Sequence, residues 1–162
     1  MIVCAPAAYA PKECSGRILT FRLTAHLEKR TLAAYELVLA RRDGALGPKL
    51  KATTAACNPE CSVGIGFGPS SFMSSESVLM SRFAFVLSVT ALRRPVIDRT
   101  GLAGQFAVSL EFAAGTDVAT APAPDAPSIF TAVEEQLGLK LKPVKAPLDV
   151  LVVDRAEKPA FD

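Results

Sequence analysis

Two aspartates, Asp98 and Asp154, are the best candidates for catalytic residues in this sequence, since each stands at the end of an apolar run. Two carboxylates in a shared cleft can act as general acid and general base when their surroundings separate their pKa values. Each aspartate also has a structural interpretation. Asp98 begins a turn that Thr100 and Gly101 complete, and Asp154 ends a strand at the surface. The sequence therefore favours a non-catalytic domain over a hydrolase-type enzyme using Asp98 and Asp154, and it assigns no catalytic residue.

His26 is the only histidine of the chain. It falls on the polar side of the alternating run Ile18 to Leu27, which predicts a half-buried strand with His26 in solvent. A general base or a metal ligand is the alternative interpretation, but no carboxylate or cysteine lies at a telling spacing from His26. We expect a solvated strand histidine.

The four cysteines, Cys4, Cys14, Cys57 and Cys61, all lie in segments with loop composition. Cysteines in such positions are free or paired in disulfides, depending on the redox compartment. Cys57 and Cys61 also have the spacing of half a metal site, but a zinc site normally needs four ligands. We predict no metal site and no cofactor.

A glycine-rich run, Gly64-Ile-Gly-Phe-Gly68, superficially resembles a loop that cradles phosphate. Such a loop should follow a strand and open a helix, whereas here Pro69 and serines follow. The run lies in the stretch 43–75, which is polar and rich in glycine and proline. We expect 43–75 to be a long loop that is flexible or faces a substrate.

Composition limits the possible functions. The chain has 162 residues, 50% hydrophobic and 21% charged, with a net charge of +2, as expected for one globular domain without an electrostatic footprint for nucleic acid. The pairs Arg41–Arg42 and Arg93–Arg94 are isolated, and solvated element ends explain them. The longest apolar run, Phe83 to Leu92, is too short for a transmembrane segment, and the N-terminus has no convincing export signal.

The C-terminal part has the clearest element boundaries. Ile129, Val133 and Leu137 predict an apolar helix face, with Asp125 or Ser128 as the N-terminal cap and Gly138 at the C-terminal end. Acidic and amide residues form the opposite face: Glu134, Glu135 and Gln136. A strand follows to Val144, with Pro143 indicating an edge position. After a turn at Lys145 to Pro147, the run Leu148 to Asp154 is apolar on both sides, which predicts a covered, central strand.

The same order of elements is predicted upstream. Ser74 or Ser75 caps a helix whose buried stripe contains Leu79, Phe83, Val86 and Leu87, and Pro95 stops it. A short strand at 95–97, a turn at 98–101 and a strand at 105–112 follow. The stretches 75–112 and 125–154 are thus two copies of one helix–strand–strand plan, joined by a small-residue linker at 113–124.

The run 32–41 is compatible with a helix, but we prefer a strand that forms a hairpin with 18–27 through the polar connection 28–30. This hairpin is a third copy that lacks its helix. Residues 1–17 have no helical or strand period, so we expect an irregular, non-native or truncated N-terminus. The predicted domain therefore comprises 18–159. Its fold class is α+β, with repeated helix–strand–strand units and a mainly antiparallel sheet covered by about two helices.

Several strings of the sequence resemble a domain-of-unknown-function family that is expanded in soil bacteria, notably the acidobacterial lineage. The resemblance covers Leu19 to Pro159, and these strings carry it: FRLTAHLEKR from Phe21, YELVLA from Tyr35, GPKLK from Gly47, RPVIDRTGLAG from Arg94 and the closing stretch from PSIF at Pro127 to EKP at Glu157. In that family a helix and a further segment precede the first hairpin. Both are missing here, which the resemblance implies is a truncation.

The resemblance also implies a cellular context. Family members are typically exported, so the expected location is periplasmic or secreted, and some carry the domain beside a membrane metallopeptidase of the beta-lactam-sensor type. The family has no established activity and no catalytic residues to carry over. The element order is also loosely similar to the short domain at the start of secretins and TonB-dependent receptors, which is an analogy of fold alone.

Two classes of function follow from these observations. The first is an exported binding or interaction module for an unknown protein, peptide or small ligand, with contacts made by sheet edges and the 43–75 loop. The second is a sensory domain associated with a membrane metallopeptidase. An enzyme that uses Asp98 and Asp154 is the weaker alternative.

Overall fold

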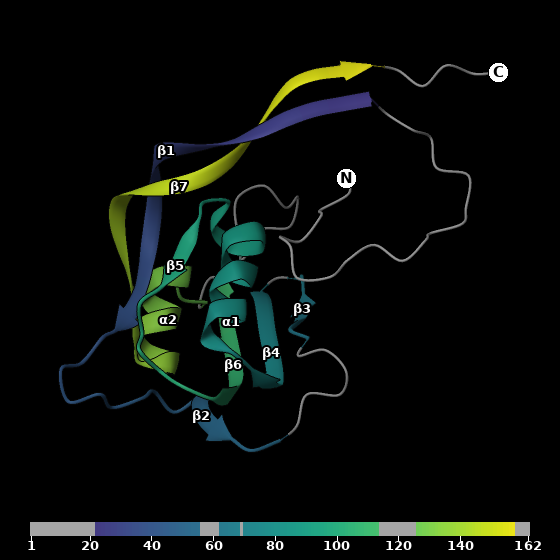
Figure 1. The fold of residues 1–162 in the computed structure, drawn as a ribbon. Helices are drawn as coiled ribbons and strands as arrows, with labels where there is room; N and C mark the ends of the chain where they lie inside the picture. The colour runs from purple at the N-terminus through teal and green to yellow at the C-terminus, as the bar shows by residue number, and fades with distance from the viewer. Residues whose placement is uncertain (1–21, 56–61, 69, 114–125, 158–162) are drawn as a thin grey trace. The chain divides into compact units, whose positions relative to one another are not determined.

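The computed structural model describes residues 22–55, 62–68, 70–113 and 126–157 (Figure 1). The chain divides into two compact units, and each is described by itself. The smaller unit comprises residues 1–29 and 149–162, and the larger one comprises 30–148. Two long strands, β1 (Arg22–Leu39) and β7 (Leu139–Glu157), contribute residues to both units. The fold is α+β, as the sequence predicts.

The larger unit contains a four-stranded antiparallel sheet in the order β2-β6-β4-β3. Its strands are β2 (Leu50–Thr53), β3 (Gly64–Gly66), β4 (Ser70–Val78) and β6 (Gln105–Ala113). The alternating pattern of β6 was predicted from the sequence and is confirmed, since one side of this strand is buried: Phe106, Val108, Leu110 and Phe112. The buried side of β6 faces the hydrophobic core.

Two helices lie on one side of this sheet, α1 (Met80–Leu87) and α2 (Ile129–Leu137) (Figure 1). Helix α1 continues into a π-helical turn, η1 (Ser88–Leu92), and the chain then passes through Arg93 into β5 (Val96–Asp98). Phe83 and Leu87 of α1 and Val133 of α2 are fully buried. The core of the larger unit therefore lies between the helices and the sheet.

The predicted boundaries of α2 are confirmed. The Ser128 side chain accepts a hydrogen bond from the Thr131 N–H, and Gly138 has a φ of 68°, the left-handed conformation that ends a helix. Val133 and Leu137 are buried, and Ile129 is half-buried, so the predicted apolar stripe faces the core. Local sequence signals are strong here because the cap side chain and the terminal glycine act within one turn.

The second sheet has the order β5-β1-β7, and within the larger unit β1 lies between the other two strands. Pairing of β5 with β1 is parallel, with Tyr35 opposite Val96. At the other edge of β1, Ala40 donates to the Gly138 carbonyl at 2.9 Å, directly before β7 begins. Among the described residues β7 has no partner strand other than β1, and it contains Pro143 and Pro147. The predicted edge position of Pro143 is confirmed.

The predicted hairpin and the predicted C-terminal turn are wrong. Residues 28–30 continue β1, and residues 145–147 continue β7. The segment from Glu28 to Arg30 has no glycine, asparagine or proline to reverse the chain, and strand pairing supplies its backbone hydrogen bonds. In β7 the prolines signalled a turn, but an edge strand tolerates proline.

Burial at these strands also differs from the prediction. Leu27, on the expected buried face of β1, is 72% exposed, and Leu151 and Val153 of β7 are 63% and 52% exposed. The strand from Leu148 to Asp154 is therefore not covered on both sides. Its apolar residues produce the pattern of a central strand, but β7 lies at the edge of its sheet.

The interval 43–75 is not one long loop, because it contains β2, β3 and the first part of β4. The serine-rich segment Ser70–Val78 is a strand, so α1 begins at Met80 and not at Ser74 or Ser75. Ser71 and Met73 face inwards and are buried. Pairing with β6 along nearly all of β4 decides its structure, and the composition of the segment cannot show that pairing. Leu79, expected in the buried stripe, is 46% exposed because it precedes the helix.

These differences remove the predicted repeat. Two strands follow α1 as predicted, but β5 and β6 belong to different sheets, whereas α2 is followed by the single long strand β7. The predicted irregular N-terminus (1–17) lies outside the described residues, and so does most of the predicted linker 113–124.

Candidate functional site

The structure pairs two residues of the smaller unit that the sequence analysis treated separately, His26 and Asp154. His26 Nδ1 lies 2.9 Å from Asp154 Oδ2. The two side chains are 53% and 44% exposed, and neither lines the clefts described below. Their separation of 128 positions explains why spacing gave no hint of a carboxylate partner. A half-exposed histidine–aspartate pair can hold one imidazole tautomer, but this pair faces solvent and not a cleft.

Asp98 belongs to the larger unit and completes the turn that the sequence predicts. Its Oδ1 accepts hydrogen bonds from the Thr100 N–H at 2.9 Å and from the Thr100 hydroxyl at 2.8 Å, and Gly101 has a φ of 69°. This is the geometry of an Asx turn. The carboxylate of Asp98 is thereby engaged in local structure, which agrees with its structural interpretation.

Two other predicted features have different outcomes. The glycine-rich run forms strand β3 at the edge of the four-stranded sheet, where Gly66 lies under the ring of Phe72 and leads to no helix. This geometry does not form a phosphate loop. Cys4, Cys14, Cys57 and Cys61 lie outside the described residues. Within the described residues, no group of three or more candidate metal ligands occurs.

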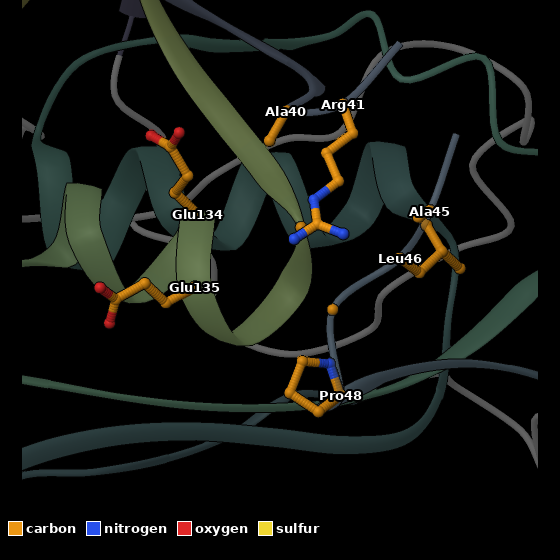
Figure 2. Close-up of a pocket in the computed structure, with 9 residues that line it drawn as sticks. Ala40, Arg41, Ala45, Leu46, Pro48, Glu134 and Glu135 are labelled. Atoms are coloured by element: carbon orange, nitrogen blue, oxygen red, sulfur yellow. The ribbon is translucent and has the colours of Figure 1, made fainter. Parts of the chain in front are cut away.

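One cleft of about 330 Å³ lies where the segment after β1 crosses the C-terminal end of α2 (Figure 2). Figure 2 shows the Arg41 side chain extending towards α2, while the carboxylates of Glu134 and Glu135 point away from Arg41. Glu134 also receives a hydrogen bond from Lys140 at 3.2 Å. The charges around this cleft are therefore mixed, and they favour neither an anion nor a cation.

The walls of this cleft are held by backbone contacts. Gly47 donates to the Leu137 carbonyl and Lys49 donates to the Gln136 carbonyl, each at 2.9 Å. A Cβ on Gly47 would lie 2.4 Å from the Gln136 carbonyl oxygen, and one on Gly138 would lie 2.6 Å from the Gly47 nitrogen. These contacts satisfy carbonyl groups that a helix end leaves open. The main role of these contacts is therefore to fix the C-terminal end of α2 to the segment after β1.

A second cleft is an open groove of about 730 Å³ between α1 with η1 and strand β5. Its apolar part is partly exposed: Phe85 is 45% exposed and Val89 is 56% exposed. Arg93 and Arg94 line the groove, and the Arg82 guanidinium carbon lies 5.3 Å from the centre of the Phe85 ring. Among the described residues that line it, none is an aspartate or a glutamate. The groove therefore combines apolar surface with positive charge.

Backbone groups at the edge of β5 run beside this groove. Tyr35 donates to the Pro95 carbonyl and Arg99 donates to the Leu37 carbonyl, so the odd-numbered residues of this segment face β1. Val96 and Asp98 therefore point to the free edge. The Val96 N–H is bound by the Ser88 hydroxyl oxygen at 2.8 Å, and that hydroxyl donates to the Ala84 carbonyl. Ser88 thus attaches β5 to α1, and the Val96 carbonyl and the backbone of Asp98 remain at the edge.

Sequence reasoning missed this groove, although its residues carry a signal. The pair Arg93–Arg94 was explained as a solvated helix end, and the run from Phe83 to Leu92 as a buried helix. The exposure of Phe85 and Val89 follows from their position on the side of α1 and η1 that faces away from the sheet. An apolar run that continues around a helix, followed directly by two arginines and a proline, was the available signal.

Comparison with known proteins gives a family but no function. Neither a curated protein nor a solved structure shows significant similarity to the chain. In the described part of the chain, no helix has the length and apolar character needed to cross a bilayer. A family described as "Protein of unknown function (DUF3738)" matches residues 19–156. This match spans most of the sequence, so the chain belongs to the DUF3738 family.

Proposed function

We propose that this chain is a non-catalytic binding module that takes an acidic, partly apolar peptide segment along the groove between α1 and β5. The observation that carries the proposal is the composition of the groove. Two half-exposed apolar side chains, Phe85 and Val89, lie beside arginines, and the described residues of the lining include no carboxylate. Exposed apolar surface bordered by charge is typical of interaction sites.

The mode of binding follows from the geometry of the groove. An apolar side chain of the peptide packs between Phe85 and Val89, and neighbouring acidic side chains pair with Arg82 and Arg94. The main chain of the peptide lies along β5, whose edge presents the Val96 carbonyl. Strand addition of this kind supplies main-chain hydrogen bonds, and alternating side chains provide specificity. Because β5 is short, Val96–Asp98, the side chains must provide most of the affinity.

The proposal includes the context that the family resemblance implies. The module functions outside the cytoplasm, and its peptide belongs to another exported protein or to the exposed part of a membrane protein. A sensory domain for a membrane metallopeptidase is one such arrangement. A fusion of the natural gene product to a reporter that is active only after export tests the location.

Binding is tested with a fluorescent eight-residue peptide of alternating aspartate and valine, measured by fluorescence anisotropy at low and moderate salt. The Asp-Val peptide is expected to bind, and a matched Lys-Val peptide is expected not to bind. The reason is that only the first peptide complements the arginines, and salt should weaken it by screening. Equal binding of both peptides, or binding of neither, contradicts the proposal.

Two arginine variants provide a matched comparison, since each replaces one member of an arginine pair and each replaced arginine lines one of the two clefts. Arg94→Glu reverses a charge in the groove, whereas Arg41→Glu reverses one in the cleft of Figure 2. Arg94→Glu should weaken binding of the Asp-Val peptide by roughly tenfold or more, because it replaces a charge-assisted contact with repulsion. Arg41→Glu should bind like the original chain. Equal loss in both variants would indicate a general charge effect and no groove.

A further inference from the structure

A separate pocket of about 360 Å³ lies at the end of the core of the larger unit. Residues of η1, the first residue of α2 and the ends of β4 and β6 enclose it. Most of its lining is apolar, with Phe67, Met73, Val89, Ala91, Phe112 and Ile129. Its volume lies in the range of small-molecule sites, and apolar lining with few polar groups is typical of them. The pocket is too small for the peptide proposed above.

The described part of the lining carries charge of one sign. Arg93 is its only charged residue within the part of the chain that the structure describes. Ile129 is the first residue of α2, so the positive end of the helix dipole adds to the same sign. The remaining polar groups are the hydroxyls of Ser71 and Thr90, and Thr90 already donates to the Val86 carbonyl at 2.6 Å. The pocket therefore complements an apolar body that carries a single negative charge.

The backbone at Arg93 gives a second, independent observation. Arg93 has a φ of 49° and directly follows the π-helical turn η1. It is the only residue other than glycine with a positive φ in the described part of the chain. A left-handed conformation costs an ordinary residue about 1 to 2 kcal/mol, and glycine would adopt it freely. Strained residues and π-turns are frequent at functional sites, so the position suggests a role for the arginine side chain.

We propose that this pocket binds a monocarboxylate with an apolar body, of the medium-chain fatty acid type. The alkyl chain lies against Met73, Phe112 and Ile129, and the carboxylate pairs with the Arg93 guanidinium. Arg93 also lines the peptide groove, so the two sites adjoin each other at this residue. The pocket does not depend on the proposed peptide function, because its apolar lining is largely distinct from that of the groove.

The test uses decanoate as the probe, added to the full chain and followed by isothermal titration calorimetry and by the shift in melting temperature. Decanoate below its micelle concentration is expected to bind with one site per chain and to raise the melting temperature. 1-Decanol, which has the same chain without the charge, is expected to bind more weakly by roughly tenfold or more, because the contact with Arg93 is lost. Equal effects of both probes would indicate non-specific hydrophobic binding and overturn the proposal.

Three variants locate the site. Arg93→Gly keeps the left-handed backbone, so it should fold, and it should lose roughly tenfold in affinity for decanoate. Ala91→Leu fills the pocket without reaching the groove and should abolish binding, and Ala113→Val serves the same purpose if Ala91→Leu does not fold. Phe85→Ala changes the groove alone and should leave decanoate binding unchanged.

The two proposals fail in distinguishable ways. Loss of decanoate binding in Ala91→Leu with normal binding of the Asp-Val peptide supports the pocket as a separate site. Normal decanoate binding in both Ala91→Leu and Arg93→Gly overturns it, whatever the peptide does. Loss of decanoate binding in Phe85→Ala also overturns it, because the probe would then occupy the groove.

Discussion

At the scale of single residues, Gly47 and Gly138 lie where a Cβ on either one would overlap the backbone of the other's segment. Gly47 has an ordinary φ but no space for a Cβ, whereas Gly138 has both a left-handed φ of 68° and a close neighbour. The two glycines therefore differ in what a side chain would disturb. Gly101 provides a third case, with a φ of 69° and nothing within 4 Å of its ideal Cβ position.

Alanine substitutions at these three glycines separate backbone strain from steric overlap. Gly101→Ala should lower the free energy of unfolding by about 1 kcal/mol, the cost of the left-handed conformation alone. Gly47→Ala should cost about 2 to 3 kcal/mol through overlap with the Gln136 carbonyl, and Gly138→Ala should combine both effects and cost the most. Urea denaturation measures the three values. If Gly47→Ala is no more destabilising than Gly101→Ala, the contact between the segment around Gly47 and the C-terminal end of α2 is looser than the structure shows.

At the scale of elements, α2 completes the edge of β6 through one side chain. Strand β2 covers β6 only as far as Val108, and beyond it the Gln136 amide takes the place of a strand. Its Oε1 accepts from the Glu111 N–H at 3.0 Å, and its Nε2 donates to the Glu111 carbonyl at 2.7 Å. The sequence predicts Gln136 on the face opposite the apolar stripe, with Glu134 and Glu135, but it does not show that this side chain reaches the unpaired part of β6.

Replacing Gln136 should therefore destabilise the protein more than replacing a neighbouring residue of α2. Gln136→Ala removes both hydrogen bonds and is expected to lower the free energy of unfolding by about 1 to 2 kcal/mol. Gln136→Glu keeps the size of the side chain but loses the donor, so the Glu111 carbonyl faces a carboxylate, and the loss should be at least as large. Glu135→Ala, at an exposed position of the same turn, is the control and should change stability by less than about 0.5 kcal/mol. Equal effects at 135 and 136 would refute the edge role.

The free edge of β7 is protected by its prolines. Pro143 and Pro147 have no backbone N–H, so this strand has two donors fewer than an ordinary edge strand, and edge strands that lack donors resist association. The double variant Pro143→Val with Pro147→Val restores two backbone donors and should form dimers or larger species at high concentration. Sedimentation velocity measures this. Lys142→Val adds an apolar side chain without adding a backbone donor, and association of this control to the same degree would attribute the effect to hydrophobicity.

The elements that could be predicted from the sequence are those whose signals act within a few residues. The caps of α2, the Asx turn at Asp98 and the alternation of β6 belong to this group. The continuous strands β1 and β7 and the serine-rich β4 could not be predicted, because partners distant in the sequence determine their structure. The groove was missed for a related reason. A pattern shows that Phe85 is apolar, but only the packing of α1 against β5 decides that it stays exposed.

At the scale of the whole molecule, burial differs sharply between the two units. The hydrophobic core lies entirely in the larger unit, from Leu37 to Leu141. In the smaller unit, residues 24–29 and 149–156 are all exposed or half-buried. The described side-chain pairs that join its strands are exposed as well, including Lys29 with Asp149 at 2.7 Å, where the two side chains are 73% and 59% exposed. Exposed ion pairs contribute little to stability, typically 1 kcal/mol or less.

This difference predicts two classes of amide exchange along the same strands. The amides of residues 24–29 and 149–156 should exchange through local opening, because two strands without a buried face are marginally stable. The amides of residues 31–39 and 139–146 should exchange more slowly, because they adjoin the core. Their free energy of opening should be higher by roughly 2 kcal/mol or more. Hydrogen exchange followed by mass spectrometry or NMR measures both classes.

The variant Lys29→Ala sharpens this prediction, because it removes the pair with Asp149 and touches no residue of the core. Exchange at 24–29 and 149–156 should become faster by up to about fivefold, the effect of one exposed ion pair, while exchange in the core strands stays the same. If both parts instead exchange at one rate that follows global unfolding, the two units unfold together.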